Sequence, residues 1–176
     1  MNLKKRSCML GIFGVILLLL LDQFTKYLAS AYLKDGHSII LIQNVFQLHY
    51  LENRGAAFGM MQGMRYLFVA GTFLMLVLLV AVYWKSPMEQ RYRWARLVLI
   101  LLAAGAMGNL IDRLYQGYVV DFFYFELIHF PIFNVADIYV TCGTALLILL
   151  FFFYYKEDDL EALISFGKKK RQDHGG

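Results

Sequence analysis

The stretch of sequence that decides the fold is FNVADIYVTCGTALLILLFFFYY, residues 133–155. Its last 18 residues, Ile138 to Tyr155, carry no charge, and at about 1.5 Å per residue a helix of about this length crosses the hydrocarbon core of a bilayer. We expect the whole span to begin near Ile132. Asp137 lies at its start, where an ionisable group costs several kcal/mol unless it is paired, hydrated or protonated. The stretch therefore predicts a membrane-spanning helix with a functional carboxylate near its beginning.

Three other segments are apolar enough to span a membrane. They run from about Cys8 to Leu33, from Tyr66 to Trp84, and from Leu97 to Asp112 or slightly beyond. The chain has 176 residues and is 60% hydrophobic, which is too apolar for an ordinary soluble core. We predict an integral membrane protein, mainly α, with four transmembrane helices. Residues 1–155 are expected to form one membrane-embedded domain, and residues 156–176 a polar, basic, frayed cytoplasmic tail.

The distribution of Lys and Arg predicts the orientation. Twelve of the 17 basic residues lie before the first span, between the second and third, or after the fourth. The positive-inside rule therefore places both termini in the cytoplasm. The first span begins like a signal peptide, but Asp22-Gln-Phe-Thr-Lys26 follows in place of small residues, so we expect this helix to be retained. The net charge of +4 and the basic tail at residues 168–171 indicate contact with anionic membrane lipids, not nucleic acid.

Two segments on the outer side are too long to be tight turns. Residues 38–43 and 45–51 of the first segment are rich in β-branched and aromatic residues and predict two short strands. In the second segment, residues 118–121 predict another strand, and the aromatic residues of 122–130 are expected to rest at the membrane interface. We therefore expect a small extracytoplasmic β-sheet above the four helices.

Polar and charged residues, whose burial in a bilayer costs free energy, gather in the outer half of the predicted membrane region. At helical rise, Asp112 lies about 24 Å and Asp137 about 28 Å from the cytoplasmic face. Lys26 lies near the outer end of the first helix, with Asp22 one turn deeper. The set comprises Asp22, Lys26, Asn53, Arg54, Asn109, Asp112, Arg113, Asp121, Asn134 and Asp137. We interpret this gathering as one site.

Asp121 and Asp137 are the candidate catalytic pair, since no basic residue adjoins either one in sequence. The chain has no zinc-binding His-Glu-x-x-His and no Gly-x-Ser-x-Gly nucleophile elbow, so we predict neither a metal nor a cofactor. Two carboxylates held close together share one proton, because both cannot ionise easily. The ionised partner can activate water while the protonated partner polarises a carbonyl. The pattern favours aspartic-protease chemistry.

Other charged residues have structural interpretations that stay open. Asp22 and Lys26 are four residues apart on one helical face and can neutralise each other. Asp112 and Arg113 can form a structural ion pair or contact a substrate.

Small residues and cysteines are expected to have packing roles. Residues 55–59, Gly-Ala-Ala-Phe-Gly, can form a turn, and Gly105 and Gly108 can let helices approach closely. Cys8 and Cys142 are predicted to lie too far apart for a disulfide.

Five blocks of sequence contain the polar residues of the predicted site: Asp22-Gln-Phe-Thr-Lys26, Asn53-Arg-Gly-Ala-Ala-Phe-Gly59, Gly108-Asn-Leu-Ile-Asp-Arg113, Gly117-Tyr-Val-Val-Asp-Phe122 and Phe133-Asn-Val-Ala-Asp137. Together they resemble the lipoprotein signal peptidases, also called signal peptidase II. Each block alone is weak, but all five in this order on four spans are specific. The resemblance covers roughly residues 8–155.

The resemblance implies a membrane aspartic endopeptidase that removes the signal peptide from diacylglyceryl-modified bacterial prolipoproteins, cleaving just before the lipidated cysteine. Asp121 and Asp137 would be its catalytic pair. The residues that would bind substrate or support the site are Asn53, Arg54, Gly55, Asn109, Asp112, Arg113, Asn134, Asp22 and Lys26. The expected partners are lipidated prolipoproteins and membrane lipids, with no obligate protein partner. The expected location is the bacterial cytoplasmic membrane, with the active site toward the extracytoplasmic face.

Two other classes of protein compete with this interpretation. Buried Asp and Lys residues also build proton relays in transporters, but here the charges cluster on one side of the membrane region and form no path across it. A non-catalytic assembly factor that binds lipidated proteins is the second alternative. Cleavage of a lipidated precursor peptide distinguishes all three.

Overall fold

The computed structural model describes residues 2–55 and 65–164. Within these residues, four helices are long and apolar enough to cross a membrane, as predicted. They are α1 (Leu3–Leu33), α2 (Arg65–Lys85), α3 (Arg93–Tyr115) and α4 (Val135–Phe153), with a short 3₁₀ turn, η2 (Gln90–Tyr92), directly before α3. α1 and α3 begin several residues before the predicted spans, because a helix can continue through charged residues that reach the membrane surface.

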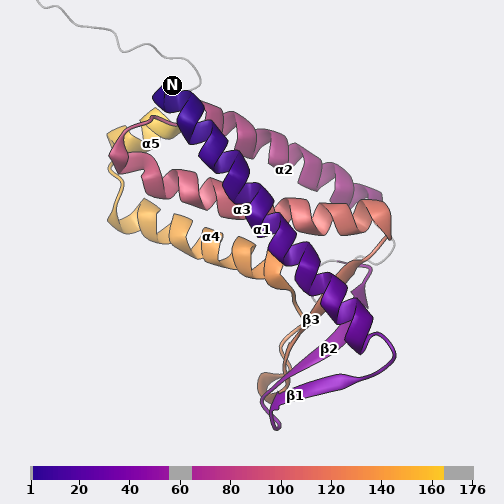
Figure 1. Cartoon of the computed structure of the whole chain (residues 1–176). Coiled ribbons are helices and arrows are strands. Elements are labelled where there is room, and N and C mark those ends of the chain that lie inside the picture. The colour runs from indigo at the N-terminus through magenta and orange to yellow at the C-terminus, as the bar shows by residue number, and fades with distance from the viewer. Residues whose placement is uncertain (1, 56–64, 165–176) are drawn as a thin grey trace, which may run out of the picture.

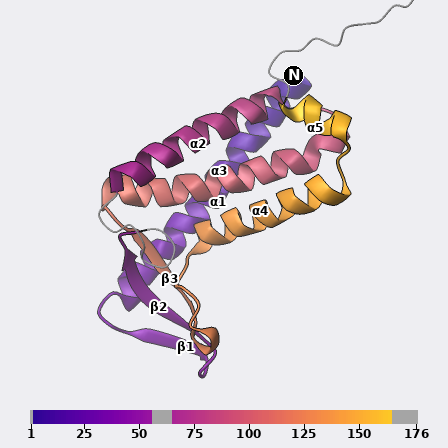
Figure 2. The ribbon, with the colours of Figure 1, turned by 180° about the vertical axis from the view of Figure 1, so that it is seen from behind.

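The helix α3 is the centre of the bundle. It packs against α1, α2 and α4, and its residues Val98 and Ala104 are completely or almost completely buried. α2, α3 and α4 lie side by side, and α1 crosses one face of this layer (Figures 1 and 2). Large apolar side chains such as Phe13, Leu74 and Phe152 point outward and are exposed. This arrangement is the one that lipid favours, since the outer surface of the bundle is apolar.

Two glycines of α3 allow the close helix approach that we predicted. A Cβ atom at Gly105 would lie 2.5 Å from the backbone oxygen of Ala136 in α4. A Cβ atom at Gly108 would lie 2.5 Å from the Oδ2 of Asp22 in α1. Both positions therefore require a residue without a side chain.

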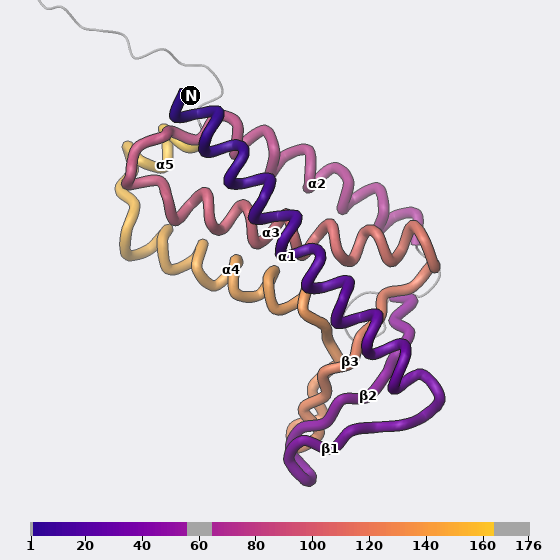
Figure 3. The backbone as a smooth tube through the Cα atoms, in the orientation of Figure 1, coloured from indigo at the N-terminus to yellow at the C-terminus, as the bar shows by residue number. Residues whose placement is uncertain are grey.

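The predicted sheet is present and has three antiparallel strands in the order β1-β2-β3. The strands are β1 (Ser38–Ile42), β2 (Phe46–Asn53) and β3 (Val119–Phe125). Asn44 turns the chain between β1 and β2 with a φ of 60°, a conformation that Asn tolerates better than most residues. The sheet lies beyond one end of the bundle, and the tube in Figure 3 shows α1 running down to it.

The third strand is longer than the sequence predicted. We expected the strand to end at Asp121, but β3 continues to Phe125, and the 3₁₀ turn η3 (Glu126–Ile128) follows. Phe122 is buried against the end of α1, and the ring of Phe123 stacks on that of Phe46 in β2. Cross-strand aromatic pairs of this kind stabilise a sheet and extend its pairing.

The expectation of a frayed tail from residue 156 is wrong for its first part. Residues Glu157–Ile164 form a helix, α5, at the end of the bundle opposite the sheet (Figure 1). Leu160 and Leu163 of α5 pack against a buried cluster that contains Tyr92 and Tyr155. The segment therefore has an apolar face. The basic residues 168–171 lie outside the described residues.

Candidate active site

A buried ion cluster joins α1 to α3. The ammonium group of Lys26 lies 2.9 Å from Asp22 Oδ2 and 3.0 Å from Asp112 Oδ2. It also donates a hydrogen bond to Asn109 Oδ1 at 2.9 Å. The exposed fractions of the two carboxylates and the lysine are only 0%, 5% and 3%. Because each of the three ammonium hydrogens has an acceptor, the buried charge is well paired.

The predicted pair of Asp22 and Lys26 is therefore confirmed, and the proposed pair of Asp112 and Arg113 is not. Asp112 turns toward Lys26 because α1 crosses α3 at this level. A partner on another helix cannot be read from neighbouring residues in sequence.

Gln23 completes the cluster and was missed by the sequence analysis. Its Nε2 lies 3.0 Å from Asp112 Oδ1, 3.2 Å from Asp22 Oδ2 and 3.3 Å from the backbone oxygen of Gly108. A polar amide next to Asp22 in an apolar span was the available signal. The other oxygen of Asp22 accepts the backbone N–H of Ala136 at 2.8 Å, so the cluster also holds the first turn of α4.

The start of α4 fixes the direction of Asp137. Asn134 caps the helix, and its Oδ1 accepts the backbone N–H of Asp137 at 2.9 Å. In return, Asp137 Oδ2 accepts the backbone N–H of Asn134 at 3.1 Å, which makes a reciprocal capping box. Asp137 Oδ1 accepts a hydrogen bond from Asn109 at 2.8 Å. Lys26, Asn109 and Asp137 thus form one continuous chain of hydrogen bonds.

Asp121 reaches the same place from strand β3. Its side chain is almost fully buried, and its two oxygens accept hydrogen bonds from Asn53 Nδ2 at 2.9 Å and from Asn134 Nδ2 at 2.6 Å. Burial, and then the negative charge of Asp137, raise the pKa of Asp121 to about 7. Asn134 therefore contacts both carboxylates of the candidate pair.

Arg113 lies beside this pair and holds the backbone around it. Its guanidinium donates to the backbone oxygens of Asn109 at 3.4 Å and of Gly55 at 3.3 Å. The same group lies over the ring of Phe68, 5.3 Å from its centroid. Arg113 thus connects α3 to the end of the segment that follows β2.

The two remaining candidate residues from this segment, Gly55 and Arg54, differ in burial and in their contacts. Gly55 is buried, and its N–H donates to Asn53 Oδ1 at 3.0 Å, which helps to orient Asn53 toward Asp121. Arg54 is exposed and pairs with Glu52 at 3.0 Å, with no hydrogen bond to the polar cluster within the described residues. Residues 56–59 of the predicted turn lie outside the described residues.

The fold and this site define a multi-pass membrane protein that presents two linked carboxylates at the sheet end of its helix bundle. Among residues 2–55 and 65–164, no three His, Cys, Asp or Glu side chains gather in a way that could hold a metal ion. The class is that of a multi-pass membrane protein with two carboxylates that share a hydrogen-bonding partner, Asn134.

Comparisons with known proteins give the family. The family model described as signal peptidase (SPase) II matches residues 14–153. A lipoprotein signal peptidase from Brevibacillus brevis is 47% identical over 127 residues, which are 72% of this chain and 84% of the relative. Another from Clostridium novyi is 42% identical over 139 residues, covering 77% and 90% of the two chains.

Solved structures agree with these relatives. A bacterial membrane enzyme determined by the in meso method at 2.3 Å resolution is 33% identical, with a TM-score of 0.73, and the match covers 80% of this chain and 86% of that one. A second, at 1.9 Å, is 32% identical with a TM-score of 0.70, covering 82% and 94%. The chain belongs to the signal peptidase II family of peptidases. Membership favours a peptidase over a transporter or an assembly factor.

Proposed function

We propose that this protein is a membrane aspartic endopeptidase that removes the signal peptide from diacylglyceryl-modified bacterial prolipoproteins, cleaving just before the lipidated cysteine. Relatives named lipoprotein signal peptidase support the activity and the class of substrate. The observation that carries the catalytic assignment is the contact of Asn134 with both carboxylates: its Nδ2 donates to Asp121 Oδ1, and its backbone N–H donates to Asp137 Oδ2. One asparagine thus links a carboxylate from a strand to a carboxylate from a helix.

In the proposed mechanism the two aspartates share one proton. Asp121 holds it near neutral pH, in keeping with its raised pKa, and hydrogen-bonds to the scissile carbonyl oxygen as negative charge develops there. Asp137, as the carboxylate, takes a proton from water while the water oxygen bonds to the carbonyl carbon. When the carbon–nitrogen bond breaks, the leaving amine takes a proton from the pair. The pair thus ends with one proton, as it began.

The remaining candidates are assigned supporting roles. Asn53, Asn109 and Asn134 fix the carboxylate oxygens by hydrogen bonds, which limits the geometries the pair can adopt. Arg113 has donors that can contact substrate carbonyls near Gly55. We assign Asp22, Lys26 and Asp112 to holding the helices in place, and Arg54 to contact with the substrate chain.

We further infer the placement of the molecule in the membrane. The basic residues favour both termini in the cytoplasm, with the sheet and the two aspartates toward the extracytoplasmic face of the bacterial cytoplasmic membrane. A lipid-anchored cysteine keeps the scissile bond near a membrane surface, which suits a site at the sheet end. Residues 1–155 would form the single peptidase domain, and residues 156–176 a basic cytoplasmic segment. We propose membrane lipids as binding partners, and we propose neither nucleic acid nor an obligate protein partner.

A cleavage assay tests the function. The purified full chain is incubated with a precursor peptide that carries a diacylglyceryl cysteine, and with the same peptide carrying an unmodified cysteine. Mass spectrometry should detect release of the signal segment, with the lipidated cysteine as the new N-terminal residue. Absence of cleavage, or cleavage at another bond, would refute the proposal. Binding without cleavage would favour the assembly factor.

A further inference from the structure

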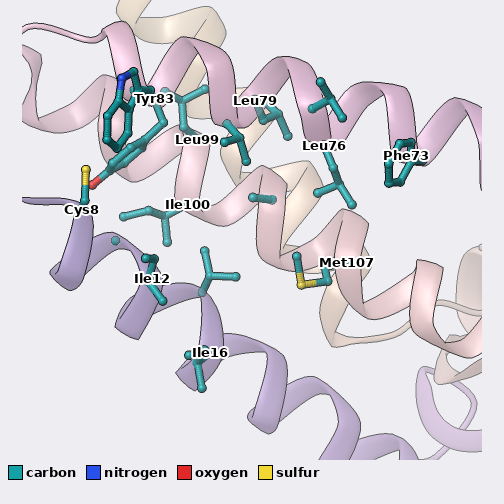
Figure 4. A pocket seen from close by; sticks show the side chains of 16 residues that line it. Cys8, Ile12, Ile16, Phe73, Leu76, Leu79, Tyr83, Leu99, Ile100 and Met107 are labelled. Carbon is teal, nitrogen blue, oxygen red and sulfur yellow. The ribbon is translucent and has the colours of Figure 1, made fainter.

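An apolar groove runs between α1 and α2 on the surface of α3. Both helices pack along α3 but contact each other at few points, so they enclose a cavity of about 720 Å³ (Figure 4). Its apolar lining includes Ile12 and Ile16 of α1, Leu76 and Leu79 of α2, and Ile100 and Met107 of α3. The volume is that of a ligand site, and the lining suits a hydrocarbon chain and not water.

A second cavity continues the groove toward the end of the bundle that carries the N-terminus. Its volume is about 390 Å³, and Gly11, Tyr83 and Ile100 line both cavities. The hydroxyl of Tyr83 donates to the backbone oxygen of Ser7 at 2.9 Å and ties α2 to α1 at the junction. The two cavities therefore adjoin each other and share part of their wall, with Tyr83 at the junction.

Three arginines line the second cavity. Arg6 comes from α1, and Arg93 and Arg96 come from the start of α3. Over residues 2–55 and 65–164, none of the three forms a salt bridge with a carboxylate. Arg96 donates to backbone oxygens of the preceding loop, while Arg6 and Arg93 are exposed. The cavity thus carries positive charge without a counterion from this part of the chain.

We propose that the two cavities bind one anionic phospholipid, with its phosphate against Arg6, Arg93 and Arg96 and an acyl chain in the apolar groove. Guanidinium groups pair with phosphate through several charge-assisted hydrogen bonds, and basic pockets between transmembrane helices suit anionic headgroups. The combination of three arginines and an adjoining apolar groove matches the two chemical parts of such a lipid. The arginine-lined cavity lies at the end of the bundle opposite Asp121 and Asp137, so the lipid site goes beyond the proposed function.

Lipid titration tests the charged half of the site. The purified, delipidated full chain is titrated with phosphatidylglycerol or with phosphatidylcholine of the same acyl chains, and bound lipid is counted by native mass spectrometry. We expect one phosphatidylglycerol to bind in clear preference to phosphatidylcholine. The double variant Arg6→Gln, Arg93→Gln should bind phosphatidylglycerol about tenfold more weakly, the order expected when charge-assisted hydrogen bonds are lost.

The control variant for charge is Lys5→Gln, Lys156→Gln. It removes two exposed positive charges from the same end of the molecule but outside the cavity, so it should retain the wild-type preference. Equal binding of the two lipids by the wild type, or equal losses in the two double variants, would overturn the proposal.

The apolar half has its own test. Ala103 lines the groove, and Ala103→Phe should fill it and lower phosphatidylglycerol binding at least severalfold. Ala145→Phe on the exposed surface of α4 is the matched control and should bind as the wild type does. Unfolding midpoints of all variants verify the fold. Wild-type binding by Ala103→Phe would show that no acyl chain occupies the groove.

Discussion

At the scale of single residues, amide side chains decide how the two carboxylates are held. Asn134 donates through its Nδ2 to Asp121, accepts through its Oδ1 from the backbone of Asp137, and donates its own backbone N–H to the Asp137 carboxylate. Asn109 connects Lys26 to Asp137, because its Oδ1 accepts a hydrogen bond from the lysine and its Nδ2 donates one to the Asp137 carboxylate. Each carboxylate is therefore fixed in direction before a substrate binds.

Because Lys26 is the cation of the buried ion cluster, its removal should strongly destabilise the fold. Lys26→Met leaves Asp22 and Asp112 buried without a positive partner, and should lower the free energy of unfolding by about 3–5 kcal/mol. The control is Lys34→Met, which breaks a pair with Glu52 at 3.4 Å whose lysine is half exposed, and should cost only about 0–1 kcal/mol. Denaturant unfolding in detergent micelles measures both. Equal effects would contradict the structural role of Lys26.

The raised pKa of Asp121 predicts that the rate of peptide cleavage depends on pH. This pKa, about 7, means that Asp121 keeps a proton below this pH and loses it as the pH rises through it. If the protonated form polarises the carbonyl, kcat/KM for a lipidated peptide should fall as the pH rises from about 6 to about 8. Unfolding midpoints over the same range control for loss of the fold. A rate that increases over this range would contradict the assignment of the proton to Asp121.

Residue spacing predicted only part of this network. Asp22 and Lys26 are one helical turn apart, so their pairing was accessible from the sequence. Asp112 and Gln23 were not, because their contacts depend on where α1 crosses α3. The candidate acid pair was predicted from its costly position in the chain, whereas its shared contact with Asn134 required the fold.

At the scale of elements, the contact between α3 and the start of α4 determines where Asp137 lies. Gly105 faces the backbone of Ala136, one residue before Asp137. Any side chain at Gly105 must push this turn of α4 away from α3, and with it the capping box. A change in the distance between α3 and α4 would therefore also move Asp137 in the candidate site.

Gly105→Ala should therefore be destabilising. The added Cβ would lie 2.5 Å from a backbone oxygen, so the helices must separate, at a cost of about 1–3 kcal/mol. Gly71→Ala in α2 is the matched control, since its Cβ would meet nothing within 4 Å, and should change stability by no more than about 0.5–1 kcal/mol, in the stabilising direction. Thermal unfolding in detergent compares them. Similar midpoints for the two variants would show that the interface tolerates separation.

Apolar length predicted the four long helices, but local pattern was a weaker guide to the short elements. The continuation of β3 past Asp121 depends on Phe46 and on the end of α1, both distant in sequence. α5 looked polar because its acidic residues dominate a short segment, while Leu160 and Leu163 find partners only on the folded bundle. Tertiary contacts therefore overrode the local signal.

At the scale of the whole molecule, the two ends of the bundle have different chemistry. The N-terminus and α5 lie at the end of the bundle opposite the sheet (Figure 1). The sheet end carries the buried acids and amides, and the other end carries the arginine-lined cavity. The proposed orientation places this second end in the cytoplasm, where basic residues are favoured.

Cysteine labelling tests that orientation. In a background with Cys8→Ser and Cys142→Ser, His37→Cys near the sheet should react with a membrane-impermeant maleimide added to intact cells. Glu161→Cys in α5 should react only after the membrane is opened. Both positions are exposed, so a difference between them reports the side of the membrane. The reverse pattern would contradict the proposed topology.

The most direct test of the central claim is the cleavage rate of the lipidated precursor peptide by Asp121→Asn and Asp137→Asn, with Asp35→Asn as the control. Asp35 is an exposed carboxylate before β1. We predict that each of the first two variants lowers kcat by about 10³-fold or more with its unfolding midpoint preserved, because one partner of the acid pair is lost. Asp35→Asn should cleave at the wild-type rate. Wild-type cleavage by either Asp121→Asn or Asp137→Asn would contradict the account.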